Sequence, residues 1–96
     1  MKITRVELRR KEREGSKIRA IAKVTLDEAF LVTGIRLLQG DDKMFIAMPN
    51  REVAEGVWDD IAHPVNQETR DMFVDAIVKA YDVMKETGED LVKIDL

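Results

Sequence analysis

The side chains best suited to chemistry in this 96-residue sequence are basic, and they gather near its start. Residues 1–26 hold nine Lys or Arg against three Glu, whereas residues 27–96 hold seven basic and sixteen acidic residues. Guanidinium and ammonium groups bind phosphates and carboxylates, so this asymmetry predicts an anion-binding surface. The alternative, which charge alone favours, is a solvated basic hairpin that helps acidic segments or acidic subunits to dock.

The remaining residues give little support to a catalytic or metal site. The chain has one His and no Cys, which excludes disulfides and thiolate metal sites. Asp59, Asp60 and His63 could be imagined as metal ligands. However, His63 precedes Pro64 in a predicted turn, and a bond from His63 to the backbone is the simpler explanation. We therefore expect no enzyme, no cofactor, no metal and no small-molecule substrate.

A strand predicted at residues 18–26 organises the basic region. Its apolar side chains recur at every second position and predict one apolar face, while a basic and polar face is interrupted only by Ile21. Residues 2–10 predict an antiparallel partner strand with Ile3 on its second face, and residues 11–16, KEREGS, suit the hairpin loop between the two. The hairpin supplies four candidate anion-binding residues: Arg9, Arg10, Lys11 and Arg13.

The third predicted strand, residues 30–39, is apolar on both sides. A β-bulge at residues 33–34 would bring Phe30 and Val32 to the same face as residues 35 and 37, because Gly34 tolerates the required dihedral angles. The opposite face would then be apolar too, and a second subunit is one way to cover it. The candidate dimer-interface residues are Leu31, Ile35, Leu38 and Ile21.

The second half of the chain predicts one long helix. Asn66 is suited to cap its start and Gly88 to end it. Between them runs an apolar stripe typical of a core face: Met72, Phe73, Ala76, Ile77, Ala80, Tyr81 and Met84.

The sequence as a whole predicts a single α+β domain. A small antiparallel sheet of about four to five strands would occupy residues 1–49 and a loop residues 50–65, in which Trp58 would act as a lid over the edge of the core. The helix would span residues 66–87, and the tail at 88–96 would form either an added edge strand or a frayed end. The start has no apolar signal-peptide core and no run is long enough for a membrane helix, so we expect a cytoplasmic protein without a membrane partner.

Three blocks of the sequence resemble the SpoVG family, the bacterial stage V sporulation protein G group associated with septation. They are IRAIAKVTLDEAFLVTGIRLLQG at residues 18–40, MFIAMP at 44–49 and DIAHPVNQETR at 60–70. The opening MKITRVELRR also fits. Typical members continue after Met-Pro with Ser and a Lys-Arg pair, whereas here Asn50-Arg51-Glu52 retains only Arg51 as a basic residue.

The resemblance implies a small homodimer with an antiparallel sheet and a C-terminal helix. It also implies a regulator of septation or sporulation that binds DNA, with RNA as the alternative nucleic-acid ligand, rather than an enzyme. The region around the helix start is implicated in nucleic-acid recognition in such proteins, and the matching residues here are Arg51, Asn66, Gln67, Thr69 and Arg70. The alternative is a non-enzymatic protein–protein adaptor in cell division that binds no nucleic acid.

Overall fold

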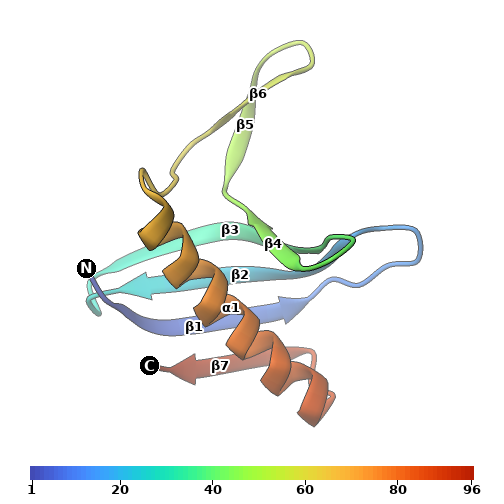
Figure 1. Cartoon of the computed structure of the whole chain (residues 1–96), viewed down its shortest axis with the longest axis vertical. Helices are drawn as coiled ribbons and strands as arrows, with labels where there is room; N and C mark the ends of the chain where they lie inside the picture. The colour runs from blue at the N-terminus through green and yellow to red at the C-terminus, as the bar shows by residue number, and fades with distance from the viewer.

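The computed structural model describes all 96 residues and shows a five-stranded antiparallel sheet, one helix and a separate two-stranded arm (Figure 1). The elements in chain order are β1 (Ile3–Arg10), β2 (Ile18–Leu26), β3 (Phe30–Gln39), β4 (Met44–Ala47), β5 (Asn50–Ala54), β6 (Val57–Asp60), α1 (Gln67–Thr87) and β7 (Leu91–Asp95). The large sheet has the order β4-β3-β2-β1-β7, which confirms the α+β fold. The tail, left open by the sequence, is an edge strand paired with β1.

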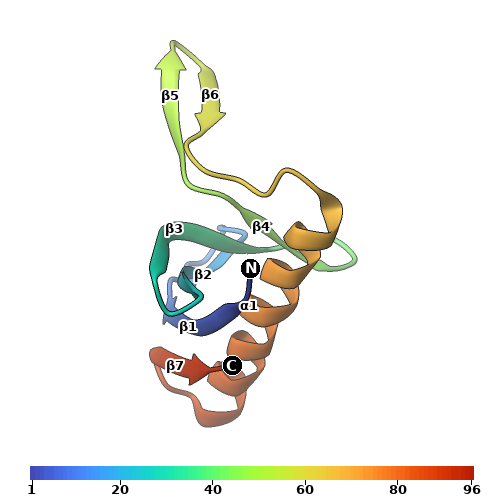
Figure 2. The same cartoon turned by 90° about the vertical axis from the view of Figure 1, so that its left-hand side faces the viewer.

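The helix α1 packs against one face of the large sheet and leaves the other face open (Figure 2). Its start is capped by Asn66, whose side chain accepts a hydrogen bond of 2.8 Å from the backbone N–H of Thr69. Its end is closed by Gly88, which has a φ of 72° and donates its N–H to the carbonyl of Met84. Both predicted caps are therefore confirmed.

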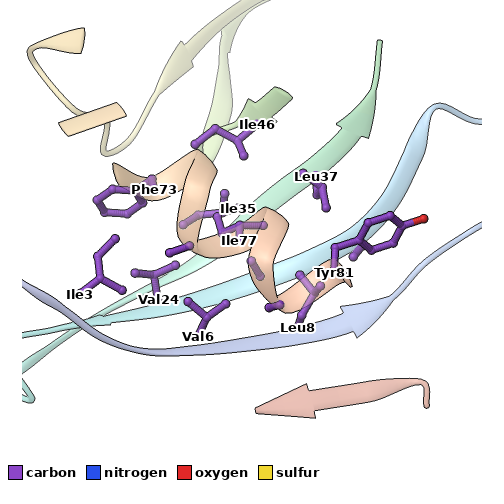
Figure 3. Close-up of a cluster of buried hydrophobic side chains, with 14 of the residues drawn as sticks. Ile3, Val6, Leu8, Val24, Ile35, Leu37, Ile46, Phe73, Ile77 and Tyr81 are labelled. Atoms are coloured by element: carbon purple, nitrogen blue, oxygen red, sulfur yellow. The ribbon is translucent and has the colours of Figure 1, made fainter. Parts of the chain in front are cut away.

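The core lies between α1 and the covered face of the sheet (Figure 3). Six of the seven stripe residues predicted for the helix are buried there, and Met72 packs at the margin. The sheet contributes the second set, of which the largest fully buried members are Leu8, Ile35, Leu37, Val6 and Val24. No helix of this chain combines the length and the apolar character needed to cross a bilayer.

Three bulges decide which side chains reach the core. In β3, Ile35 pairs with Ala22 and Val32 pairs with Val24, so three steps on β3 oppose two on β2. This is the bulge predicted at residues 33–34, and Gly34 supplies its φ of 77°. It buries Val32 with Ile35, but Phe30, expected on the same face, is 65% exposed at the strand end.

The other two bulges place Ile3 and Ile18 on the faces opposite to those predicted from the sequence. Ile3 pairs with Leu26 while Arg5 pairs with Thr25, and this irregularity turns Ile3 into the core instead of the second face. Ile18 pairs with Leu38, a residue of the open face, because the register shifts between Ile18 and Ala20.

Residues 50–65 are not a simple loop, since β5 and β6 pair there as an antiparallel hairpin. We call residues 50–60 the arm. The arm extends away from the sheet and the helix in both views (Figures 1 and 2). Trp58 is 59% exposed on it and covers no part of the core, so the interpretation as a lid was wrong.

Candidate functional site

The candidate site begins with the β1–β2 hairpin, which we call the ribbon (residues 9–19). Arg10 points to the helix side of the ribbon, where its guanidinium donates to the carbonyl oxygens of Met84, at 3.4 Å, and Glu89, at 3.3 Å. It also pairs with the carboxylates of Glu12, at 3.4 Å, and Asp90, at 3.3 Å. Arg10 therefore anchors the ribbon to the carboxyl end of α1 and is not free to bind an anion.

Glu12 completes this anchor through Tyr81 of the helix. The Tyr81 hydroxyl donates a hydrogen bond of 2.7 Å to Glu12 Oε1. Burial raises the pKa of Tyr81, and the bond to the Glu12 carboxylate raises it further. The same bond lowers the pKa of Glu12, because it favours the charged carboxylate. The helix side of the ribbon is thus an internally satisfied cluster.

Three other cations of the ribbon form no ion pair, whereas Arg19 donates a hydrogen bond of 2.9 Å to the carbonyl oxygen of Ser16. Six ion pairs form in the structure, and none involves Arg9, Lys11 or Arg13. All three side chains are exposed. Arg9 and Lys11 flank Arg10 in the chain, so the alternation of a strand turns them to the face opposite the helix. A shallow hollow beside them is lined by Glu7, Arg9, Lys11, Ile21 and Lys23.

Arg36 extends this charge across the open face. Arg9 pairs with Ile21, and Ile21 pairs with Arg36, so the three residues form one row over β1, β2 and β3. Adjacent strands are about 4.8 Å apart, which places the backbones of Arg9 and Arg36 about 10 Å from each other. The composition gave no reason to select Arg36, because only the register reveals this row.

The remaining cations of the open face are paired with acids. Arg5 bonds Asp95 at 2.8 Å, and this contact raises the pKa of the Arg5 guanidinium. Lys23 and Lys93 share Glu7, at 3.6 and 3.5 Å. Unpaired positive charge is therefore concentrated at the end of the face that leads into the ribbon.

The candidates around the helix start form a different group. The side chain of Asn66 caps the helix and accepts a hydrogen bond from the backbone N–H of Thr69. The side-chain amide of Gln67 donates a hydrogen bond of 2.8 Å to the carboxylate of Asp71. Arg70 is half-buried and Arg51 is exposed on the arm, and neither forms an ion pair.

The two groups of candidates lie at opposite ends of the molecule. The ribbon contacts the last turn of α1, and Figure 1 shows the first turn of α1 at the far end of the sheet. The structure therefore does not bring the ribbon and the helix start together within one chain.

The candidate dimer-interface residues divide between the surface and the core. Leu31 is 53% exposed on the open face, where Ile21 and Leu38 are half-buried. Ile35 is fully buried under the helix, so its inclusion was wrong: the bulge at Gly34 places it on the core face.

The sequence analysis missed two apolar residues of the open face, Ile18 and Phe45. Ile18, Leu38 and Phe45 form an apolar row over β2, β3 and β4, through the pairings of Leu38 with the other two. Strict alternation along residues 18–26 placed Ile18 on the core face, and only the bulge reveals its true position.

His63 makes the backbone contact expected of it. Its Nδ1 lies 2.9 Å from the carbonyl oxygen of Pro64. No three His, Cys, Asp or Glu side chains gather closely enough in this structure to hold a metal ion.

Comparison with known proteins places the chain in a family. The SpoVG family model matches residues 1–83. A protein of Caldicellulosiruptor bescii is 44% identical over 89 residues, which cover 93% of this chain and 100% of the relative.

A protein of Alkaliphilus metalliredigens is 44% identical over 94 residues, which cover 98% of this chain and 95% of the relative. One from Staphylococcus aureus strain MRSA252 is 39% identical over 90 residues, covering 94% and 89%. All three bear the name "Putative septation protein SpoVG". The resemblance carried by residues 18–40, 44–49 and 60–70 is thereby confirmed, and this chain belongs to the SpoVG family.

Proposed function

We propose that this protein is a septation-associated regulator that binds DNA, with RNA as the alternative ligand, as a homodimer and without a catalytic step. The septation names of its relatives support the process. The observation that carries the binding is the division of the ribbon: Arg10 and Glu12 anchor it to the helix, while Arg9, Lys11 and Arg13 remain unpaired.

Phosphate contacts are the chemistry that these cations suit. A protein that neutralises phosphates with Lys or Arg releases condensed counterions, and this release drives binding of any sequence. A two-stranded ribbon also has dimensions that fit the major groove of duplex DNA.

The long helix is unsuited to the same role. Its outer faces carry acidic residues, which would be repelled by phosphates: Glu68, Asp71, Asp75, Asp82 and Glu86. The helix start is the competing site that the family resemblance indicates. Its unpaired cations are Arg51 and Arg70. Asn66 and Gln67 also lie there, but their side chains already have hydrogen-bond partners within the helix.

Two variants with the same loss of charge separate these sites. Arg9→Ala/Lys11→Ala removes two cations from the ribbon, and Arg51→Ala/Arg70→Ala removes two from the arm and the helix start. Affinity for mixed duplex and single-stranded fragments is measured at one salt concentration. We expect the ribbon variant to lose about tenfold in affinity and the second variant less than twofold. The reverse order would move the site to the helix start, and no binding by the wild type would reject the proposal.

A protein–protein adaptor is the second candidate function, favoured by the arm. Val53, Val57 and Trp58 are exposed there although each is large and apolar. A wild-type protein that binds no nucleic acid in the experiment above would favour this function.

A further inference from the structure

We propose that the arm of one copy docks on the open sheet face of a second copy. This inference rests on the homodimer in the proposed function and specifies the contact that holds it together. The two docking surfaces come from the same chain, so a two-fold symmetric pair would contain the contact twice.

The arm has no support of its own in the single chain. It is a two-stranded hairpin, and such hairpins are marginally stable in water unless they pack on something else. β5 and β6 contact each other but form no substantial contact with the helix or the large sheet. Every residue from Arg51 to Asp60 is exposed. An external surface that packs on the arm would explain why it keeps a defined fold.

The arm also combines apolar and acidic side chains. Val53, Val57 and Trp58 are its exposed apolar residues. Its charged residues are one cation, Arg51, against four acids: Glu52, Glu55, Asp59 and Asp60. A surface that accepts the arm must therefore offer apolar area together with positive charge.

The open sheet face has both properties. Its apolar part comprises Leu31 and the row formed by Ile18, Leu38 and Phe45, none of which the helix covers. Apart from Arg9, which the ribbon presents to nucleic acid, strand alternation places four cations and two acids on the same face: Arg5, Lys23, Arg36 and Lys93, with Glu7 and Asp95. The charge of the face is thus opposite to that of the arm.

A chain does not cover its own open face with this arm. The arm leaves the body after β4 and extends away from the sheet in both views (Figures 1 and 2). Because its charge complements a face present on every copy, we assign the second copy as the occupant.

The test uses one variant on each surface. The arm variant is Val53→Ser/Val57→Ser/Trp58→Ser, and the face variant is Leu31→Ser/Phe45→Ser. All five residues are exposed in the single chain, so both variants should fold. Val65→Ser is the matched control, since Val65 is 90% exposed and lies outside both surfaces. Sedimentation velocity over a concentration series measures self-association without nucleic acid, and thermal unfolding checks the fold.

We expect the wild type and Val65→Ser to dimerise, and each surface variant to dimerise at least a hundredfold more weakly. An equimolar mixture of the two variants should form heterodimers, because one intact arm then meets one intact face. A monomeric wild type, surface variants that dimerise like the wild type, or a mixture that does not associate would each overturn the proposal. A monomeric wild type that still binds nucleic acid would leave the ribbon site standing.

Discussion

Tyr81 of α1 donates a hydrogen bond of 2.7 Å to the carboxylate of Glu12, which lies 69 positions earlier in the chain. The bond joins the carboxyl end of the helix to the ribbon, in the same place where Arg10 binds the carbonyl oxygens of Met84 and Glu89. The bond therefore determines which side of the ribbon faces the helix. Arg9 and Lys11 lie on the opposite side and face the solvent.

Tyr81→Phe removes this hydroxyl and retains the buried ring. We expect the free energy of unfolding at pH 7 to fall by about 1 kcal/mol, the usual contribution of one hydrogen bond. Urea unfolding measures the change. Lys79→Ala, an exposed change on the same helix, is the control and should stay within about 0.5 kcal/mol of the wild type. An equal effect of both substitutions would show that the bond contributes nothing specific.

The same bond predicts a pH dependence. The folded state lowers the pKa of Glu12 below its ordinary value of 4.5, so the stabilisation is complete above that value and is lost as the pH falls through the lower folded pKa. The difference in stability between the wild type and Tyr81→Phe should therefore shrink between about pH 6 and pH 3. Urea midpoints across this range measure it, and a constant difference would contradict the assignment to Glu12.

Gly34→Ala should destabilise the bulge in β3. Gly34 has a φ of 77°, a left-handed conformation that costs a residue with a Cβ about 1–2 kcal/mol. Its added Cβ would lie an ordinary 3.6 Å from the Cβ of Pro49, so strain in the backbone, and not a clash, sets the cost. Thr33→Ala at the adjacent exposed position is the control, and a similar loss in both variants would argue against this explanation.

Asn66→Ala distinguishes a cap from a nucleic-acid contact. Loss of the 2.8 Å bond to the N–H of Thr69 should lower the free energy of unfolding by about 1 kcal/mol. Affinity for nucleic acid should change by less than twofold once the variant is confirmed to be folded. A large loss of affinity without a loss of stability would assign Asn66 to recognition.

Val92→Ala tests whether β7, formed by the tail, stays paired with β1 and contributes to the stability of the fold. Val92 is buried beside Leu8, its partner on β1, so removing two methyl groups should cost about 1–2 kcal/mol. Leu91→Ala, on the open face of the same strand, should lower the free energy of unfolding by much less. Thermal unfolding compares the two, and equal midpoints would indicate that β7 frays in solution.

The sequence pattern predicted the first four strands of the large sheet and the helix, but it left open whether β7 would pair. The stripe from Phe73 to Met84 and the strand at residues 18–26 have strong, uninterrupted periods, and both lie where the pattern placed them. The bulge at Gly34 was also predictable, because the apolar parity changes at a residue that tolerates positive φ. The bulges that move Ile3 and Ile18 carry no glycine, so the parity of these residues misled the prediction.

The arm and the exact site depend on features outside any local pattern. Residues 50–60 have mixed polarity, and their pairing is visible only in the register of β5 against β6. Which cations are free depends on distant partners: Asp95 neutralises Arg5 although 90 positions separate them. Composition could therefore identify a basic hairpin but could not separate Arg10, which is engaged, from Arg9, which is not.

The dependence of binding on salt tests the central claim most directly, which is that the unpaired cations of the ribbon contact phosphates. Affinity for one duplex DNA fragment is measured over a range of salt concentrations for the wild type and for Arg9→Ala/Lys11→Ala. We expect the logarithm of the wild-type affinity to fall linearly with the logarithm of salt concentration. We expect the variant's slope to be shallower by about 1.8, since each phosphate contact contributes about 0.9. A wild-type affinity that ignores salt, or equal slopes for the two proteins, would contradict the account.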